Sequence, residues 1–115
     1  MFYENLVVLV GRATRDAEIK SVGSSQVCQF RLVSNKRIKK RDGTYGEKST
    51  FIDCEAWDSG AEVITKYISK GDPLLVKGSL KNDRWENKEG KTVTKIKLRV
   101  EDFELPRRLP KQEVA

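Results

Sequence analysis

Two aromatic rings and two carboxylates alternate within one short segment, and this is where the sequence first suggests chemistry. The segment STFIDCEAW places Phe51, Asp53, Glu55 and Trp57 at every second position. A period of two is typical of a β-strand, in which alternate side chains share a face. Because this face also carries charge, we expect both rings to contact water, which marks the strand as a candidate binding surface.

The two carboxylates raise a second possibility, a metal-dependent nuclease in which Asp53 and Glu55 would hold the metal ion. The chain has no histidine and two cysteines, which excludes the usual four-ligand zinc site and any catalysis by histidine. Because the carboxylates alternate with rings along a strand, we expect no enzyme: no catalytic residue, no metal site and no cofactor. Nuclease activity stays a minor alternative, which magnesium added to labelled single-stranded DNA would reveal.

A short amphipathic helix is predicted directly after this strand. Ser59 stands three residues before Glu62, the spacing of a capping box, and apolar side chains then recur at helical intervals. Gly71 is expected to end the helix, and the segment LLVKGSL can then return to the sheet. Within that strand, Gly78 predicts a bulge or a close approach of two backbones.

Strand patterns also occur on both sides of this unit. Residues 5–10 form a β-branched apolar run that we expect to be buried on both faces. Residues 27–35 and 92–103 alternate, and the second of these segments should place three apolar side chains inward. These are Ile96, Leu98 and Val100. The resulting order of three strands, one helix and two strands is typical of the OB-fold, an all-β, five-stranded Greek-key barrel that binds oligonucleotides.

The positive charge of the chain is concentrated in two separate blocks. The formal net charge is +6, which permits an anionic partner but does not establish one. Residues 31–48 carry seven basic and two acidic side chains, and we expect residues 36–47 within this block to form a long hairpin loop around Asp42. Residues 77–99 carry eight basic and three acidic side chains, in a hairpin that turns near Gly90. Such runs are also typical of a solvated surface without a ligand.

The two cysteines are expected to lie close together inside the barrel. If Ser34 and Thr50 bracket an antiparallel hairpin, paired residues have numbers that sum to about 84, and Cys28 and Cys54 fall near this register. Both alternate onto the inward, apolar face. The spacing is compatible with a disulfide only for a directly opposed pair, and we expect both to remain thiols in a reducing cytoplasm.

Five blocks of this chain resemble the bacterial single-stranded DNA-binding protein family. In order, they are NLVVLVGRATRDAEIK, CQFRLVSNKR, STFIDCEAW, AEVITKYISKGDPLLVKGSL and DRWENKEGKTVTKIKLRVEDFEL. No single block is decisive, but five in the right order are highly specific, and they extend to about Leu105. The resemblance implies an OB-fold protein that coats unpaired DNA without sequence preference during replication, recombination and repair. It also implies a homo-oligomer, usually a homotetramer, with a dimer possible.

The resemblance further implies a DNA-binding site that combines rings for the bases with cations for the phosphates. Phe51, Trp57 and Trp85 match family positions whose rings stack on bases, and Lys70 matches a basic position after the helix. Further basic residues lie in the family's DNA-contacting loops. These are Lys36, Arg37, Lys39, Lys40 and Arg84.

Several positions depart from the family pattern. Ile38 stands where many relatives have another stacking ring, whose role could shift to Tyr45, and Asp83 stands at an arginine position. Asp53 and Glu55 are unusual on a DNA-binding face because their charge repels phosphate. They are expected to point past the edge of the groove or towards a partner subunit.

The domain is expected to cover residues 1–105, followed by a loose tail over residues 106–115. This tail lacks the acidic, hydrophobic tip by which bacterial family members recruit repair and replication proteins, so we expect a short or truncated form without such recruitment. The chain contains no apolar run long enough to span a membrane and no secretory signal, so we expect no membrane partner and a location in the cytoplasm, with the nucleoid.

Two alternatives remain open. The three rings could instead belong to the core or to a subunit interface, because interfaces also favour aromatic residues. The protein could also be an adaptor like the primosomal OB-fold proteins, which resemble this family but act mainly through protein–protein contacts. The combination of exposed rings with two basic blocks favours the DNA-coating function.

Overall fold

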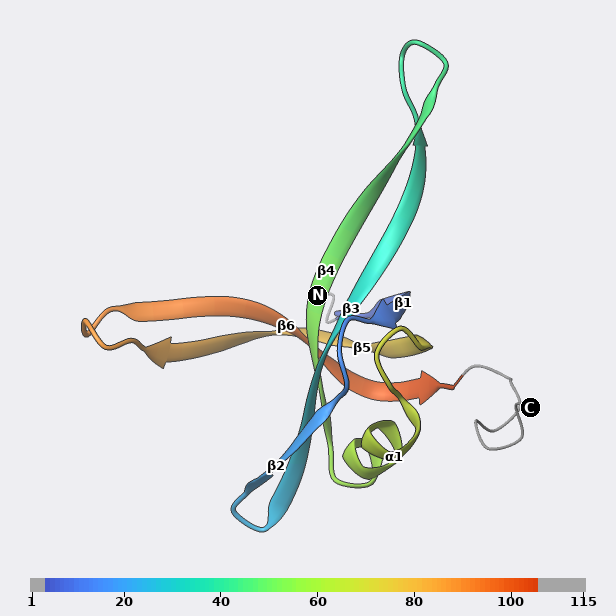
Figure 1. Ribbon diagram of the computed structural model, residues 1–115. Helices are drawn as coiled ribbons and strands as arrows, with labels where there is room; N and C mark the ends of the chain where they lie inside the picture. Colours follow the sequence, from blue (N-terminus) through green and yellow to red (C-terminus); the bar gives the residue numbers. More distant parts are fainter. Residues whose placement is uncertain (1–3, 106–115) are drawn as a thin grey trace.

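The computed structural model describes residues 4–105, which form a closed β-barrel with one helix beneath it (Figure 1). Two long hairpins project from the barrel, one upward and one to the left in this view. The tail expected at residues 106–115 lies outside the described residues. No helix in residues 4–105 combines the length and the apolar character that crossing a membrane requires.

Within residues 4–105, six strands and one helix follow in chain order. They are β1 (Val7–Ala13), β2 (Glu18–Val22), β3 (Ser25–Lys39), β4 (Tyr45–Trp57), α1 (Ser59–Tyr67), β5 (Pro73–Glu86) and β6 (Thr92–Glu104). β1 and β2 together take the place of the predicted first strand, since both pair with β3. The sequence does not predict β2, because all its side chains are exposed and no alternation of apolar and polar residues occurs there.

Five of these strands close the barrel, which confirms the predicted OB-fold. β1 pairs with β5, β5 with β6, β6 with β4 and β4 with β3, and β3 returns to β1. The β4–β6 pair is parallel and the other pairs are antiparallel. The helix lies between β4 and β5 in the chain, as the element order predicts.

The core lies where the inward faces of the strands meet α1. β3 contributes Cys28, Phe30 and Leu32, β4 contributes Cys54 and Ala56, β5 contributes Leu74 and Val76, and β6 contributes Leu98. The helix covers this set with its apolar face, on which Ala61 and Ile64 are fully buried. These contacts confirm the predicted inward face of β4 and the amphipathic helix.

Two predictions about apolar residues are wrong. Residues 5–10 are not buried on both faces, because β1 turns only one face to the core: Val8 and Val10 are 54% and 59% exposed. Ile96, predicted to face inward, is 53% exposed. It pairs with Asn82 on the part of the β5–β6 hairpin that extends beyond the barrel (Figure 1), so there is no core on either side of it.

Both ends of α1 differ from the prediction, and local contacts of Asp58 explain the difference at the first end. The helix is capped at Asp58, which has a positive φ of 51° and makes no side-chain hydrogen bond to the helix, so the predicted capping box does not form. The Asp58 carboxylate instead accepts a hydrogen bond from the Gln26 backbone N–H at 3.1 Å, which ties the helix entry to β3. The helix ends at Tyr67, and Gly71 lies in the turn beyond it.

The first basic block is a long β-hairpin rather than a long loop. β3 continues to Lys39 and β4 begins at Tyr45, so that only residues 40–44 form the turn. Within this turn the Asp42 carboxylate accepts hydrogen bonds from the Thr44 N–H and hydroxyl at 3.0 and 2.6 Å. We call this projecting hairpin the β3–β4 arm, and the corresponding part of β5 and β6 the β5–β6 arm, whose turn lies at Gly90 as predicted.

Gly78 marks a close approach of two backbones, as predicted. The register of β5 against β6 shifts between Lys77 and Gly78, and a Cβ atom at Gly78 would overlap the backbone carbonyl oxygen of Arg99. Only glycine fits this position without moving β6.

The β3–β4 register confirms the predicted position of the cysteines. Cys28 pairs with Ala56 and Cys54 with Phe30, so the two thiols are diagonal neighbours rather than a directly opposed pair. Both are free and buried. Burial, aided by the charge of Asp53, raises the pKa of Cys54 to about 12, and burial also raises the pKa of Cys28.

We therefore expect both thiols to react slowly with a thiol reagent in the native protein and rapidly after denaturation. The thiolate is the reactive form, and at neutral pH these buried groups are protonated. The rate of release of a chromogenic thiol product measures this directly. Rapid labelling of either cysteine in the folded protein would show that this face is not buried.

Candidate nucleic-acid interface

The outward faces of β3 and β4 form a continuous surface that carries two of the three predicted stacking rings. The antiparallel register places Phe51 opposite Val33 and Trp57 opposite Val27. Phe51 is 51% exposed, and the Arg31 guanidinium lies over its ring, 5.0 Å from the centroid. This position lets the cation attract the face of the ring and leaves the ring accessible from solvent.

The third ring lines a groove between the barrel and the β5–β6 arm. The groove encloses about 580 Å³ and is lined from β3, β4, β5, β6 and the β1–β2 link. Trp85 is 44% exposed at this groove. The groove also contains four cationic side chains: Arg15, Arg31, Lys95 and Lys97. A flat ring among cations in a groove is the combination that suits the base faces and phosphates of an unpaired strand.

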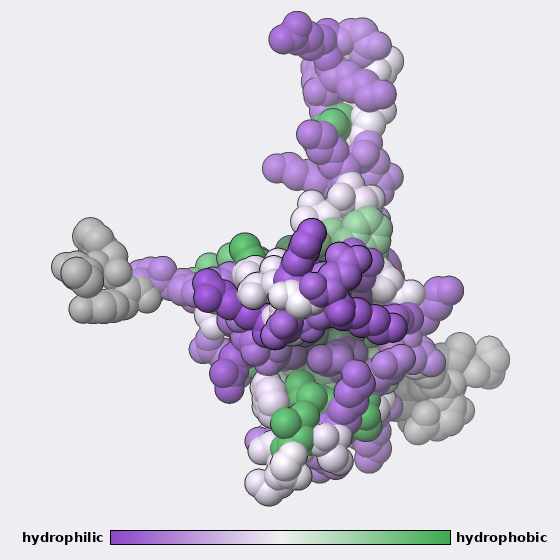
Figure 2. Space-filling view, turned by 90° about the vertical axis from the view of Figure 1, so that its left-hand side faces the viewer, coloured by the Kyte–Doolittle hydropathy of each residue, from purple (hydrophilic) through white to green (hydrophobic). Residues whose placement is uncertain are grey.

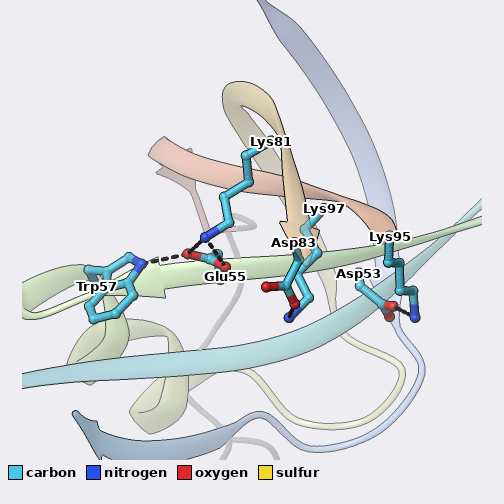
Figure 3. A network of polar contacts seen from close by, with 7 residues as sticks. All are labelled: Asp53, Glu55, Trp57, Lys81, Asp83, Lys95 and Lys97. Carbon is cyan, nitrogen blue, oxygen red and sulfur yellow. Dashed lines mark hydrogen bonds and ion pairs between the residues drawn. The ribbon is translucent and has the colours of Figure 1, made fainter. Parts of the chain in front are cut away.

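Trp57 is held in place by a buried carboxylate. Its indole N–H donates to Glu55 Oε2 at 2.6 Å, and the Lys81 ammonium lies 3.0 Å from Glu55 Oε1 (Figure 3). Glu55 is only 4% exposed, so the expectation that it points past the groove edge is wrong. The buried charge is tolerated because it is paired with a lysine and satisfied by the indole.

Asp53 and Asp83 also form ion pairs within the protein. Asp53 contacts Lys95, and its other oxygen lies 3.5 Å from Arg31 Nε. Asp83 lies 2.8 Å from the Lys97 ammonium, and the hydrogen bond from Lys97 lowers the pKa of this carboxyl. Figure 3 shows the pairs in a row where the β5–β6 arm crosses β4. The expectation that Asp53 points out of the groove is therefore also wrong.

The basic residues predicted on the β3–β4 arm are exposed, and they divide between its two faces. Alternation places Arg37 and Lys39 on the face of Phe51, and Lys36 on the opposite face, while Lys40 lies in the turn. Figure 2 shows this arm, at the top of the view, as mostly hydrophilic. The arm thus presents cations to solvent in more than one direction.

The same arm carries a further exposed ring. Tyr45 is 55% exposed and lies under the Arg37 guanidinium, 4.0 Å from the ring centroid. It shares the alternation of Phe51 on β4, and it pairs with Lys39. A ring is therefore available near the tip of the arm, although Ile38 stands where the resemblance described above implies another ring.

Two predicted basic residues lie apart from this surface. Arg84 is exposed on β5. Because it directly precedes Trp85 in the strand, its side chain points to the face of the β5–β6 arm opposite to that of the Trp85 ring. Lys70 lies in the turn after α1, where its backbone N–H donates to the Asp16 carboxylate at 2.8 Å, and it does not line the groove. Of the predicted site residues, Trp85 lines the groove, while Phe51 and Trp57 lie on the outward face of β4 beside it.

Reasoning from the sequence did not group the four cations that line the groove with Trp85. Arg15, Arg31, Lys95 and Lys97 come from three different parts of the chain and meet only in the folded groove. The alternation of the last strand does predict that Lys95 and Lys97 face outward. The alternation does not indicate that each of these two lysines forms an ion pair with a carboxylate. Among residues 4–105, no cluster of three or more metal-ligating side chains occurs.

Comparisons with known proteins point in the same direction as this geometry. A family model described as "Single-strand binding protein family" matches residues 4–106. The single-stranded DNA-binding protein of Treponema pallidum is 40% identical over 103 residues, covering 88% of this chain and 57% of the relative. Single-stranded DNA-binding protein 1 of Synechocystis sp. is 39% identical over 103 residues, covering 88% of this chain and 82% of the relative.

A solved structure described as "Plasmodium falciparum SSB complex with ssDNA" has the same fold. Its TM-score is 0.82 at 22% sequence identity, with 93% of this chain and 98% of that chain covered. The chain spans 60%, 49% and 57% of the length of the relatives from Helicobacter hepaticus, Helicobacter pylori and Treponema pallidum.

Proposed function

The chain belongs to the single-strand binding protein family, and on this basis we propose that it binds and coats single-stranded DNA without sequence preference. The observation that carries the proposal is the placement of the Trp85 ring among four cations in one groove. The Arg31 guanidinium, which lines the same groove, lies 5.0 Å from the centroid of the Phe51 ring, and this supports a single binding surface for both rings. Sequence preference is not expected because every base has a face on which a ring can stack.

In this mechanism the rings and the cations contact different parts of the DNA strand. Phe51, Trp57 and Trp85 stack on bases, while the cations of the groove and of the β3–β4 arm neutralise phosphates. Lys36, Arg37, Lys39 and Lys40 would guide the strand along that arm. Lys70 and Arg84, which lie apart from the groove, would contact a strand that wraps around the barrel. The protein acts as a binder rather than as an enzyme, with no cofactor.

We also propose that the protein works as a homo-oligomer, a homotetramer or a dimer. The outward face of β1 supports this, because Val8 and Val10 are more than half exposed, and Leu6 just before the strand is 69% exposed. A run of exposed aliphatic side chains on one strand is typical of a surface that another subunit covers. Its cellular roles would be replication, recombination and repair, with DNA in the cytoplasm.

Titration of the protein with oligothymidine tests the proposed function. Stacking of bases on Trp57 and Trp85 should quench tryptophan fluorescence in a saturable way. The affinity should fall with salt, and the fall should be roughly linear when both are plotted as logarithms. The mass of the complex in solution would give the number of subunits at the same time. If oligothymidine neither quenches the fluorescence nor binds, the proposed function is wrong.

A further inference from the structure

Three of the four cations in the groove are already paired with carboxylates of the same chain. Asp53 contacts Lys95 and lies 3.5 Å from Arg31, and Asp83 lies 2.8 Å from Lys97. A phosphate group that enters the groove must therefore take the place of a carboxylate to reach any of these three cations. Cations that are simply solvated would not present this competition.

The carboxylates on this face differ in how firmly they are held. Glu55 is 4% exposed and has both an indole donor and a lysine as partners. These contacts hold the carboxylate in place, and the carboxylate in turn positions Trp57. The side chain of Asp53 is 23% exposed, and the side chains of its partners Arg31 and Lys95 are about half exposed. Ion pairs that water reaches to this extent are weak and exchange readily.

We propose that Asp53 and Asp83 act as internal competitors of the DNA phosphates. In the unbound protein they hold Arg31, Lys95 and Lys97, and they yield these cations when a single strand enters the groove. This inference rests on the proposed function and specifies how the affinity of the same site is regulated. Glu55 does not take part in the exchange, because its partners keep it in place.

The exchange has a consequence for the salt dependence of binding. A cation that neutralises a phosphate releases a counterion from the DNA, and this release makes binding weaken with salt. A carboxylate that loses its partner in the same step attracts a cation from solution, which offsets part of that release. The protein should therefore bind with a shallower salt dependence than its number of phosphate contacts would give, and with lower affinity at low salt.

The variant Asp53→Asn tests this directly, because asparagine keeps the size of the side chain and removes its charge. We expect its affinity for oligothymidine at low salt to rise roughly three- to tenfold. The slope of log affinity against log salt should steepen, because the variant has no carboxylate at this position to attract a cation from solution when DNA binds, so that the gain shrinks as salt increases. Binding is read from the quenching of tryptophan fluorescence.

Glu62→Gln is the matched control. It changes the net charge by the same amount, and Glu62 lies exposed on α1, outside the groove lining. The inference is overturned if Asp53→Asn binds no more tightly than Glu62→Gln at low salt, or if the two variants have the same slope. Asp83→Asn, which frees Lys97, provides a second test with the same expected sign should Asp53→Asn fail to fold.

This result is distinguishable from failure of the proposed function. If the unmodified protein does not bind oligothymidine, the proposed function itself is wrong. If it binds, and the folded Asp53→Asn variant keeps the affinity or the slope of the control, only the competition is wrong. Comparing thermal unfolding of all the variants shows whether a changed affinity comes from a changed fold.

Discussion

Replacing Trp85 by alanine should weaken binding to oligothymidine by about 1 to 3 kcal/mol, the range found for base stacking in proteins of this class, with the salt slope nearly unchanged. The ring lines the groove and is 44% exposed, so it is free to stack on a base. Stacking releases few ions, which is why affinity should fall while the slope stays. Tryptophan quenching from Trp57 and a labelled oligothymidine both report the binding.

The double variant Lys39→Ala and Lys40→Ala should be compared with Trp85→Ala, because it removes cations rather than a ring. It removes two exposed cations from the β3–β4 arm and should flatten the salt slope, because fewer phosphates are neutralised. Trp57→Ala should lose affinity to a similar extent as Trp85→Ala, but it also removes the indole donor of buried Glu55. Its stability must therefore be measured beside its affinity.

The outcome that would contradict the stacking role is specific. If the tryptophan variants unfold or change their oligomeric state, while binding per folded molecule stays intact, the rings belong to the core or to a subunit interface. A loss of affinity accompanied by an equal loss of slope would instead indicate that phosphate contacts were lost.

Gly78→Ala should lower the free energy of unfolding by about 3 kcal/mol. The added methyl group would overlap the Arg99 carbonyl oxygen, which is backbone of the paired strand and cannot move aside as a side chain can. β5 and β6 would have to separate at the point where β5 also pairs with β1. Urea unfolding followed by tryptophan fluorescence gives the change in free energy.

Gly60→Ala is the control for this substitution. Gly60 lies in the first turn of α1, and a methyl group there would meet the Phe103 ring at 3.6 Å, an ordinary contact. It should be neutral or slightly stabilising, because alanine favours the helix more than glycine does. Equal stability of the two variants would show that β5 and β6 do not approach as closely at Gly78 as described.

The barrel could be predicted from the sequence because its central strands alternate strongly. β4 buries Cys54 and Ala56 and exposes Phe51, which is the pattern that the two-residue period predicts. The numbering of the β3–β4 pairs also follows from the hairpin alone, and Ser34 does pair with Thr50. Where one face of a strand meets the core, the register leaves a clear trace in the sequence.

The projecting arms could not be predicted in the same way. Beyond the barrel both faces of a strand meet water, so alternation loses its meaning, and charged residues such as those around Lys39 suggest a loop. The prediction for Ile96 fails for the same reason: its two-residue spacing from Leu98 predicts an inward side chain, but the barrel ends between the two residues. Neither the length of an arm nor the end of a barrel is encoded in a local pattern.

The rings of the site could be predicted from the sequence, whereas the charged side chains around them could not. Phe51 and Trp57 belong to one strand, so their shared face follows from alternation. The lysine partners of Asp53 and Glu55 come from β5 and β6, and only the crossing of these strands over β4 brings Lys81 and Lys95 to them. Long-range ion pairs of this kind depend on the assembled topology.

Competition between single-stranded and duplex DNA tests the central claim most directly. Labelled oligothymidine bound to the protein at moderate salt is challenged with an unlabelled oligonucleotide or with a duplex of equal length. The rings and cations of the groove predict that the single strand displaces the label efficiently and that the duplex, whose bases are stacked and paired, does so poorly. Equal displacement by both would contradict base stacking at this face and leave only a general attraction between a basic protein and DNA.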